Sequence, residues 1–189
     1  MRVIIRGMED RRPFIDYLQA NLPEAEWCYD EIRDGMDTFI RAMRKAGDEP
    51  CIHMEDDTIL SKDFLKNAMK VIRQKPFNVI NFFSMRKDDV EIGSRWNRQF
   101  SACVCFYLPP TYSRLIADYR QSIVDGAYTK YPYPYIRKGF DILIQNFLRE
   151  RREKHWIHCP SLVEHREAIS MIDKKRSSKR QSTSFVNPI

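Results

Sequence analysis

The sequence lacks any hydrophobic run long enough to cross a membrane. Its longest apolar stretches, at residues 77–83 and 101–110, fall well short of the roughly 20 residues that a transmembrane helix needs. The apolar run in the first residues is also too short for a signal peptide. We therefore expect a protein that works in the cytoplasm without membrane insertion.

Several common functional motifs are missing as well. The sequence contains neither G-x-G-x-x-G nor G-x-x-x-x-G-K-[ST], which removes the usual signals for dinucleotide binding and for a P-loop. It also contains no H-E-x-x-H, no G-x-S-x-G and no internal repeat. Any catalytic function must therefore depend on other combinations of residues.

The cysteines follow neither a disulfide pattern nor a zinc pattern. Their odd number, without a secretion signal, favours reduced thiols. Cys103 and Cys105 are two residues apart, which places both on one face of a strand and does not suit zinc. We expect all five to be small buried residues: Cys28, Cys51, Cys103, Cys105 and Cys159.

What the sequence does have is an ordinary globular composition. Of the 189 residues, 43% are hydrophobic and 31% are charged, which suits one domain with a real core and excludes a disordered, collagen-like or coiled-coil chain. We expect this domain at residues 1–173 and a basic, serine-rich segment at residues 174–189. The net charge of +6 favours a polyanionic partner such as nucleic acid, an anionic membrane or a phosphorylated ligand. A basic surface without a partner is the alternative.

Strand-like and helix-like segments alternate along the chain. Strands are predicted at residues 3–6, 26–29, 50–54, 78–83, 102–108, 156–159 and 162–164. Helices are predicted at residues 13–22, 36–46, 61–74, 111–123 and 140–152. This alternation predicts an α/β fold with a mainly parallel sheet. Residues 84–100 are expected to be irregular, and residues 125–138 an extended loop.

An acidic triplet, Glu55-Asp56-Asp57, directly follows the predicted strand at residues 50–54. Three neighbouring carboxylates repel one another unless a positive charge compensates them. At the carboxyl end of a strand in an α/β sheet, a bound divalent cation is the candidate compensator. A solvated acidic turn before the next helix is the alternative.

Four further residues have a possible chemical role and a simpler alternative. His165 could complete a carboxylate metal site or be structural. Asp141 could bind an acceptor hydroxyl or remove its proton, or it could cap the helix that follows. Lys179 and Arg180 suit a diphosphate, or belong to a disordered basic tail.

Taken in order, these segments resemble a known enzyme family. The segments are Thr38-Phe39-x-Arg41-Ala42, Glu55-Asp56-Asp57, the helix of Asp141 and Pro160-Ser161-Leu162-Val163-Glu164-His165. Together they look like a compact GT-A glycosyltransferase, similar to small phage-encoded DNA-base glycosyltransferases and to lipopolysaccharide-type transferases. The resemblance covers about residues 1–185. It implies a Rossmann-type sandwich with a mostly parallel central sheet and a minimal acceptor subdomain.

The resemblance also implies roles for individual residues. Asp57 would ligate Mn²⁺ or Mg²⁺ directly, His165 would complete the coordination, and Asp141 would contact the acceptor or act as the base. The remaining residues would bind the nucleotide-sugar donor, UDP-glucose or a similar compound. They are Glu55 and Asp56 of the E-D-D variant of the D-x-D motif, Arg6, Gly7, Arg11 and Asp30, and, less typically for the family, Lys179 and Arg180 closing over the diphosphate.

Basic and aromatic residues bear on the acceptor. Residues 128–138 mix four tyrosines with Lys130, Arg137 and Lys138, and residues 86–98 place Trp96 among arginines. Aromatic rings stack on bases, while cations neutralise phosphates. These residues favour DNA as the acceptor. The resemblance to phage-encoded transferases then implies a hydroxymethylated pyrimidine in double-stranded DNA, in the host cytoplasm for a phage-encoded protein. The alternatives are a glycan or lipopolysaccharide acceptor, or a non-catalytic nucleic-acid-binding domain, and no partner protein is implied.

Overall fold

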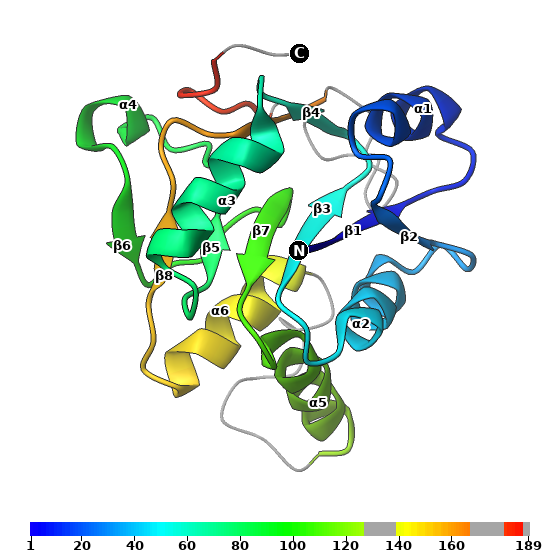
Figure 1. Cartoon of the computed structure of the whole chain (residues 1–189). Helices are drawn as coiled ribbons and strands as arrows, with labels where there is room; N and C mark the ends of the chain where they lie inside the picture. The colour runs from blue at the N-terminus through cyan, green and yellow to red at the C-terminus, as the bar shows by residue number, and fades with distance from the viewer. Residues whose placement is uncertain (127–138, 167–179, 187–189) are drawn as a thin grey trace.

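A computed structural model describes residues 1–126, 139–166 and 180–186 of the chain, and Figure 1 shows their arrangement. The strands are β1 (Arg2–Gly7), β2 (Glu26–Tyr29), β3 (Cys51–Glu55), β4 (Thr58–Leu60), β5 (Ile80–Asn81), β6 (Arg95–Asn97), β7 (Cys105–Leu108), β8 (His155–Ile157) and β9 (Val163–His165). The helices are α1 (Arg12–Asn21), α2 (Gly35–Ala46), α3 (Phe64–Gln74), α4 (Asp89–Ile92), α5 (Tyr112–Val124) and α6 (Phe140–Glu150).

The described residues form a central sheet of seven strands in the order β2-β1-β3-β7-β5-β8-β6. Strands β2, β1 and β3 are parallel, and so are β5 and β8, whereas β7 and β6 run antiparallel to their neighbours. The expected α/β fold with a mostly parallel sheet is therefore confirmed, with two reversed strands that the sequence did not predict. Outside this sheet, β4 and β9 form an antiparallel pair.

Helices cover both faces of the sheet, which makes an α/β/α sandwich (Figure 1). Because side chains alternate along a strand, Val3 and Ile5 of β1 pack on one face with buried residues of α1 and α3. On the other face, Phe106 and Leu108 of β7 pack with buried residues of α2, α5 and α6. This layered arrangement is compatible with a Rossmann-like sandwich.

Helix α2 illustrates a segment whose ends follow from local sequence. The side chain of Asp34 accepts hydrogen bonds from the backbone N–H groups of Met36 and Asp37, which caps the first turn. The helix ends at Gly47, which has a φ of 60° and donates its N–H to the carbonyl of Met43. The prediction of a helix at residues 36–46 is confirmed, with a start one residue earlier at Gly35.

Other segments differ from the prediction. The strand expected at residues 78–83 is reduced to β5, because the side chain of Asn81 accepts a hydrogen bond from the Phe83 N–H and the chain then leaves the ladder. Residues 84–100, expected to be irregular, contain α4 and β6. Helix α3 begins at Phe64, three residues after the predicted start, because Asp63 adopts a left-handed conformation with a φ of 57°.

The expectation that Cys103 and Cys105 share one face is wrong. Strand β7 begins only at Cys105, and the chain before it is irregular, with a positive φ of 59° at Ala102. As a result, Cys105 packs with the core on the α1 and α3 side, while Cys103 packs with the core on the α2, α5 and α6 side. Four of the five cysteines are buried as expected, and Cys159 is partly exposed.

No helix in the described ranges is long and apolar enough to span a membrane. The predicted extended loop at residues 125–138 falls almost entirely outside the described residues, as do the four tyrosines in it.

Two buried histidines predict a loss of stability in acid. Burial lowers the pKa of His53, and burial with the nearby charge of Arg86 lowers the pKa of His155 to about 4. In the unfolded chain a histidine takes up its proton near pH 6.5. The unfolded state therefore binds more protons between about pH 6.5 and 4, and stability falls as the pH falls through this window.

Replacement of His155 by Phe or Asn removes one of these titrations. We expect either variant to lose about 2–3 kcal/mol less free energy of unfolding than the wild type between pH 7.5 and 4.5. Urea unfolding at both pH values measures this difference, which does not depend on how stable each variant is at neutral pH. Parallel pH profiles for wild type and variants would contradict the assignment.

Candidate metal centre

The acidic triplet lies between the end of β3 in the central sheet and the start of the separate β4–β9 pair. Glu55 ends β3, and the antiparallel pairing of β4 with β9 places His165 opposite Thr58, next to Asp57. The Arg166 N–H donates to the Asp57 carbonyl at 2.7 Å and extends this pairing by one residue. Two segments distant in sequence are thereby brought together at the carboxyl end of β3.

Glu55, Asp57 and His165 have the geometry of a metal-binding group. One ligand atom from each residue lies within 4.8 Å of the others, and Nε2 of His165 is 3.5 Å from Oδ2 of Asp57. Oδ1 of Asp57 and Nδ1 of His165 are buried and have no hydrogen-bond partner among the described residues. Carboxylate oxygens with one imidazole suit a divalent cation such as Mn²⁺.

Asp56 makes different contacts from its two neighbours. Its carboxylate accepts hydrogen bonds from the Met8 N–H at 2.9 Å and from Nη1 of Arg11 at 2.8 Å. Burial raises the pKa of Asp56, with a further increase from the charge of Asp57, although Arg11 opposes both. Asp56 therefore anchors the loop after β1.

Arg11 also reaches Asp57, with 3.1 Å between Nη1 and Oδ2. Burial alone would lower the pKa of Arg11, but the charges of Asp56 and Asp57 raise it above its ordinary value. The sequence interpretation attributed charge compensation of the triplet to a bound cation. Part of that compensation comes from Arg11 on the neighbouring loop.

Gly7 leaves the space that Asp56 needs. A Cβ atom at position 7 would lie 2.6 Å from Cβ of Asp56 and 2.7 Å from its Oδ2. Such distances are far below van der Waals contact, so that a side chain at this position would displace the carboxylate. The predicted site residue Gly7 is thus a packing requirement of the acidic triplet.

Glu55 faces a buried cation on the adjacent strand. Arg6 and Glu55 are register partners of β1 and β3, and their side chains approach to 3.7 Å. Burial raises the pKa of Glu55 to about 7, the charge of Asp57 adds to this, and Arg6 and Arg180 oppose it. The Glu55 side chain keeps 20% of its exposure, so that it stays accessible to a ligand from solvent.

Arg6 itself is held inside the protein. Its Nη2 donates to the Cys103 carbonyl at 2.7 Å, and its guanidinium lies 5.1 Å, 5.4 Å and 5.8 Å from the ring centroids of Phe39, Phe140 and Phe106. Aromatic faces stabilise a cation at such distances. This burial suits a residue that positions Glu55. A contact between Arg6 and a nucleotide base or ribose stays a prediction.

Two other predicted residues lie around this centre. The Asp30 N–H donates to the Gly7 carbonyl at 2.8 Å, and Oδ1 of Asp30 accepts from the Asp34 N–H at 3.0 Å. Asp141 lies in the first turn of α6, whose N-cap is Gly139. The charges of Asp141 and Glu55 both add to the rise in the pKa of the Cys103 thiol, whose main cause is burial. Phe140, next to Asp141, has its ring 5.4 Å from the guanidinium of Arg6, which is the ion-pair partner of Glu55. The first turn of α6 is therefore close to the side of the sheet that Glu55 faces.

Residues 180–186 pack against the segment that contains His165. The backbone N–H of Ser182 donates to both oxygens of Glu164, at 3.0 Å and 3.1 Å, and the Ser182 hydroxyl donates to that of Ser161 at 2.8 Å. The charge of Arg180 acts on the pKa of Glu55. Arg180 is thus close to the carboxylates, whereas Lys179 lies outside the described residues.

The sequence interpretation missed Arg166. Its guanidinium stacks 4.4 Å from the ring centroid of Tyr17 and 5.0 Å from that of Phe14, and Arg11 also lies over the Phe14 ring, at 5.8 Å. Arg6 and Arg11 thus contact the carboxylates directly, Arg166 stacks on the same Phe14 ring as Arg11, and the charge of Arg180 acts on Glu55. The only sequence signal for Arg166 was its position directly after His165.

No model of a known protein family matches the chain. A search of curated proteins gave no significant match either. The function of the chain must therefore be argued from its residues and their geometry.

The second basic and aromatic segment, residues 86–98, is partly engaged within the protein. Arg95 forms an ion pair with the buried Asp89 at 2.7 Å, and the Trp96 ring packs edge-on against Trp156 with 5.3 Å between centroids. Arg86 donates to the Gln99 carbonyl at 3.2 Å. These contacts occupy some of the side chains that were predicted to contact DNA.

Proposed function

We propose that the chain is a metal-dependent glycosyltransferase that moves a sugar from a nucleotide sugar, such as UDP-glucose, to an acceptor hydroxyl. The observation that carries this proposal is the convergence of Glu55, Asp57 and His165 within 4.8 Å at the carboxyl end of β3. In open α/β sheets, ligands bind outside the carboxyl ends of the strands. A structural acidic turn would not need a buried imidazole brought from a distant segment.

Asp57, Glu55 and His165 are the residues that would hold the divalent cation, Mn²⁺ or Mg²⁺. The buried and unpartnered Oδ1 of Asp57 supports this assignment, as does the mixed carboxylate and imidazole donor set. A divalent cation at such a site supplies positive charge against the negative charge that develops as a nucleoside diphosphate leaves.

The arginines around the centre supply positive charge to a donor diphosphate. Arg180 is near enough to Glu55 to act on its pKa, and Arg11 bridges Asp56 and Asp57. We assign Arg180 and Lys179 to the diphosphate, and the loop from Gly7 to Arg11, with Asp30, to the nucleoside. Arg6 acts by positioning Glu55.

Asp141 is the candidate for the acceptor side. It lies in the first turn of a helix whose Phe140 ring contacts Arg6, the ion-pair partner of Glu55. We assign its carboxylate to accept a hydrogen bond from the acceptor hydroxyl, and to take the proton if the configuration at the sugar carbon is inverted. The net charge of +6 favours a polyanionic acceptor such as duplex DNA. We assign a hydroxymethylated pyrimidine as the acceptor base because it offers a hydroxyl to the sugar.

The proposal is tested by release of UDP from UDP-glucose. The assay compares Mn²⁺, Mg²⁺ and EDTA, each with unmodified, 5-hydroxymethylcytosine and 5-hydroxymethyluracil duplexes of the same sequence. We expect release only with a metal ion, and an increase only with the hydroxymethylated duplexes, because these alone offer the acceptor hydroxyl.

Other outcomes assign the chain differently. Metal-dependent release that is the same with every duplex would support a transferase with a glycan acceptor. The internal contacts of Arg95 and Trp96 are consistent with this outcome, because they leave these side chains less available to DNA. Duplex binding without release from any common sugar nucleotide would indicate the non-catalytic nucleic-acid-binding domain.

A further inference from the structure

A pocket of about 490 Å³ lies at the end of the strands opposite to the one that carries the metal centre. Asn78 and Val79 directly precede β5, and Glu153 and Lys154 directly precede β8, so that the pocket is at the amino ends of these parallel strands. Glu55, in contrast, is at the carboxyl end of β3, which runs in the same direction. The pocket is therefore separate from the centre described above.

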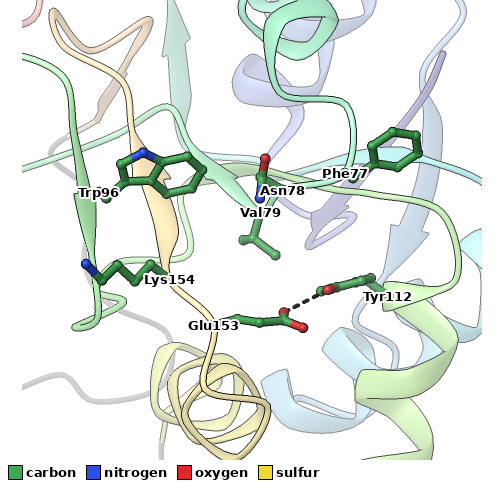
Figure 2. Close-up of a pocket in the computed structure, with 7 residues that line it drawn as sticks. All are labelled: Phe77, Asn78, Val79, Trp96, Tyr112, Glu153 and Lys154. Atoms are coloured by element: carbon green, nitrogen blue, oxygen red, sulfur yellow. Dashed lines mark hydrogen bonds between the residues drawn. The ribbon is translucent and has the colours of Figure 1, made fainter.

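Aromatic side chains form two sides of this pocket. Figure 2 shows Trp96 on one side and Phe77 on the other, with Asn78 and Val79 between them and Tyr112 and Glu153 below them in the view. Phe77 is 76% exposed and Trp96 is 43% exposed, although both are large apolar residues. Exposed rings around a concave site indicate a flat apolar ligand that stacks on them.

The charged groups at the pocket leave positive charge available to a ligand. Its one carboxylate, Glu153, already accepts from the Tyr112 hydroxyl at 2.7 Å and from Nε of Arg151 at 2.9 Å. Lys154 lies on the rim, and Nζ of Lys75 is 5.6 Å from the centroid of the Trp96 ring. Lys75 does not line the pocket and lies closer to the Trp156 ring, at 4.0 Å, but it is near the pocket edge at Trp96. Because Glu153 is already engaged by Tyr112 and Arg151, Lys154 is the charged group of the lining that is left to a ligand, which favours one that is both flat and anionic.

We propose that this pocket binds a short stretch of single-stranded nucleic acid. One base stacks on the Phe77 ring and another on the Trp96 ring, and Lys154, with Lys75 nearby, neutralises the flanking phosphates. A paired base could not enter, because both of its faces are covered by neighbouring bases in a duplex. A volume of about 490 Å³ is within the range of small-ligand sites. This site goes beyond the proposed transferase activity and does not rest on it.

Binding of a labelled oligothymidylate tests the proposal. Fluorescence anisotropy compares an oligomer of about 12 nucleotides with an abasic oligomer of the same length, which keeps the phosphates and lacks the bases. Both are measured in EDTA, so that a failure of the metal centre cannot affect the result. We expect the oligothymidylate to bind about tenfold or more tightly than the abasic oligomer.

Variants then locate the binding. Phe77→Ala and Trp96→Ala should each remove most of the difference between the two oligomers, and Phe77 is exposed enough for its replacement to leave the fold intact. Lys154→Ala should lower the slope of log affinity against log salt by about 0.7, because one phosphate contact is lost. Lys66→Ala, at an exposed position in the first turn of α3, is the matched control and should change neither quantity.

Three results would overturn the proposal. Equal affinity for the two oligomers would reduce the site to a basic surface. An oligothymidylate preference that survives both aromatic variants would place base binding elsewhere. Quenching of tryptophan fluorescence by a neutral oligosaccharide but not by oligothymidylate, lost in Trp96→Ala, would assign the pocket to a glycan.

Discussion

Replacement of Asp57 by Asn is expected to abolish metal-dependent release of UDP from UDP-glucose. The substitution keeps the size of the side chain but removes the charge of the carboxylate whose Oδ1 is buried and unpartnered among the described residues. It also removes one of the three groups that converge within 4.8 Å. Because stabilisation of developing charge often contributes the largest part of a rate enhancement, we expect a loss on the order of a thousandfold.

The same variant should fail to bind Mn²⁺, which electron paramagnetic resonance of the free ion measures without a substrate. His165→Gln should weaken Mn²⁺ binding less severely, since both carboxylates remain. Asp16→Asn, which changes an exposed carboxylate on α1, is the matched control and should bind Mn²⁺ as the wild type does. If Asp57→Asn bound Mn²⁺ with unchanged affinity, the metal centre would have to be abandoned, whatever the activity of the chain.

Replacement of Gly7 by Ala is expected to destabilise the protein by about 2–3 kcal/mol. The new methyl group would lie 2.6 Å from Cβ of Asp56, which cannot move without breaking its hydrogen bonds to the Met8 N–H and to Arg11. Since Arg11 also contacts Asp57, the displacement should weaken Mn²⁺ binding as well. Urea unfolding and Mn²⁺ titration measure the two effects separately.

Gly139→Ala is the matched control for this substitution. A Cβ at position 139 would meet the Asp141 carboxylate at 2.6 Å and the Ile142 side chain at 3.3 Å, which are outer parts of flexible side chains. The neighbours can move there, and we expect a change within about 1 kcal/mol. Equal stability of the Gly7→Ala variant and the wild type would show that the space beside Asp56 is not required.

Several features of the candidate centre could be predicted because they depend on neighbouring residues. The apolar run before the acidic triplet predicts a strand that ends at the carboxylates, and β3 ends at Glu55. The apolar side of residues 36–46 and the following Gly47 predict helix α2 almost to the residue, and the structure adds the N-cap at Asp34. The strand expected at residues 78–83 was less well predicted. There the side chain of Asn81 accepts a hydrogen bond from the Phe83 N–H, which competes with pairing to a neighbouring strand.

The sequence by itself determined the alternation of strands and helices and the acidic triplet at a strand end, because hydrophobic periodicity and capping act over a few residues. Only the tertiary structure decided that His165 lies beside Asp57, through the pairing of β4 with β9. It also decided that Arg11 shares the charge of the triplet, and that Phe77 and Trp96 face one pocket. Each of these contacts joins segments far apart in the chain, and such contacts leave no pattern in the sequence of either segment alone.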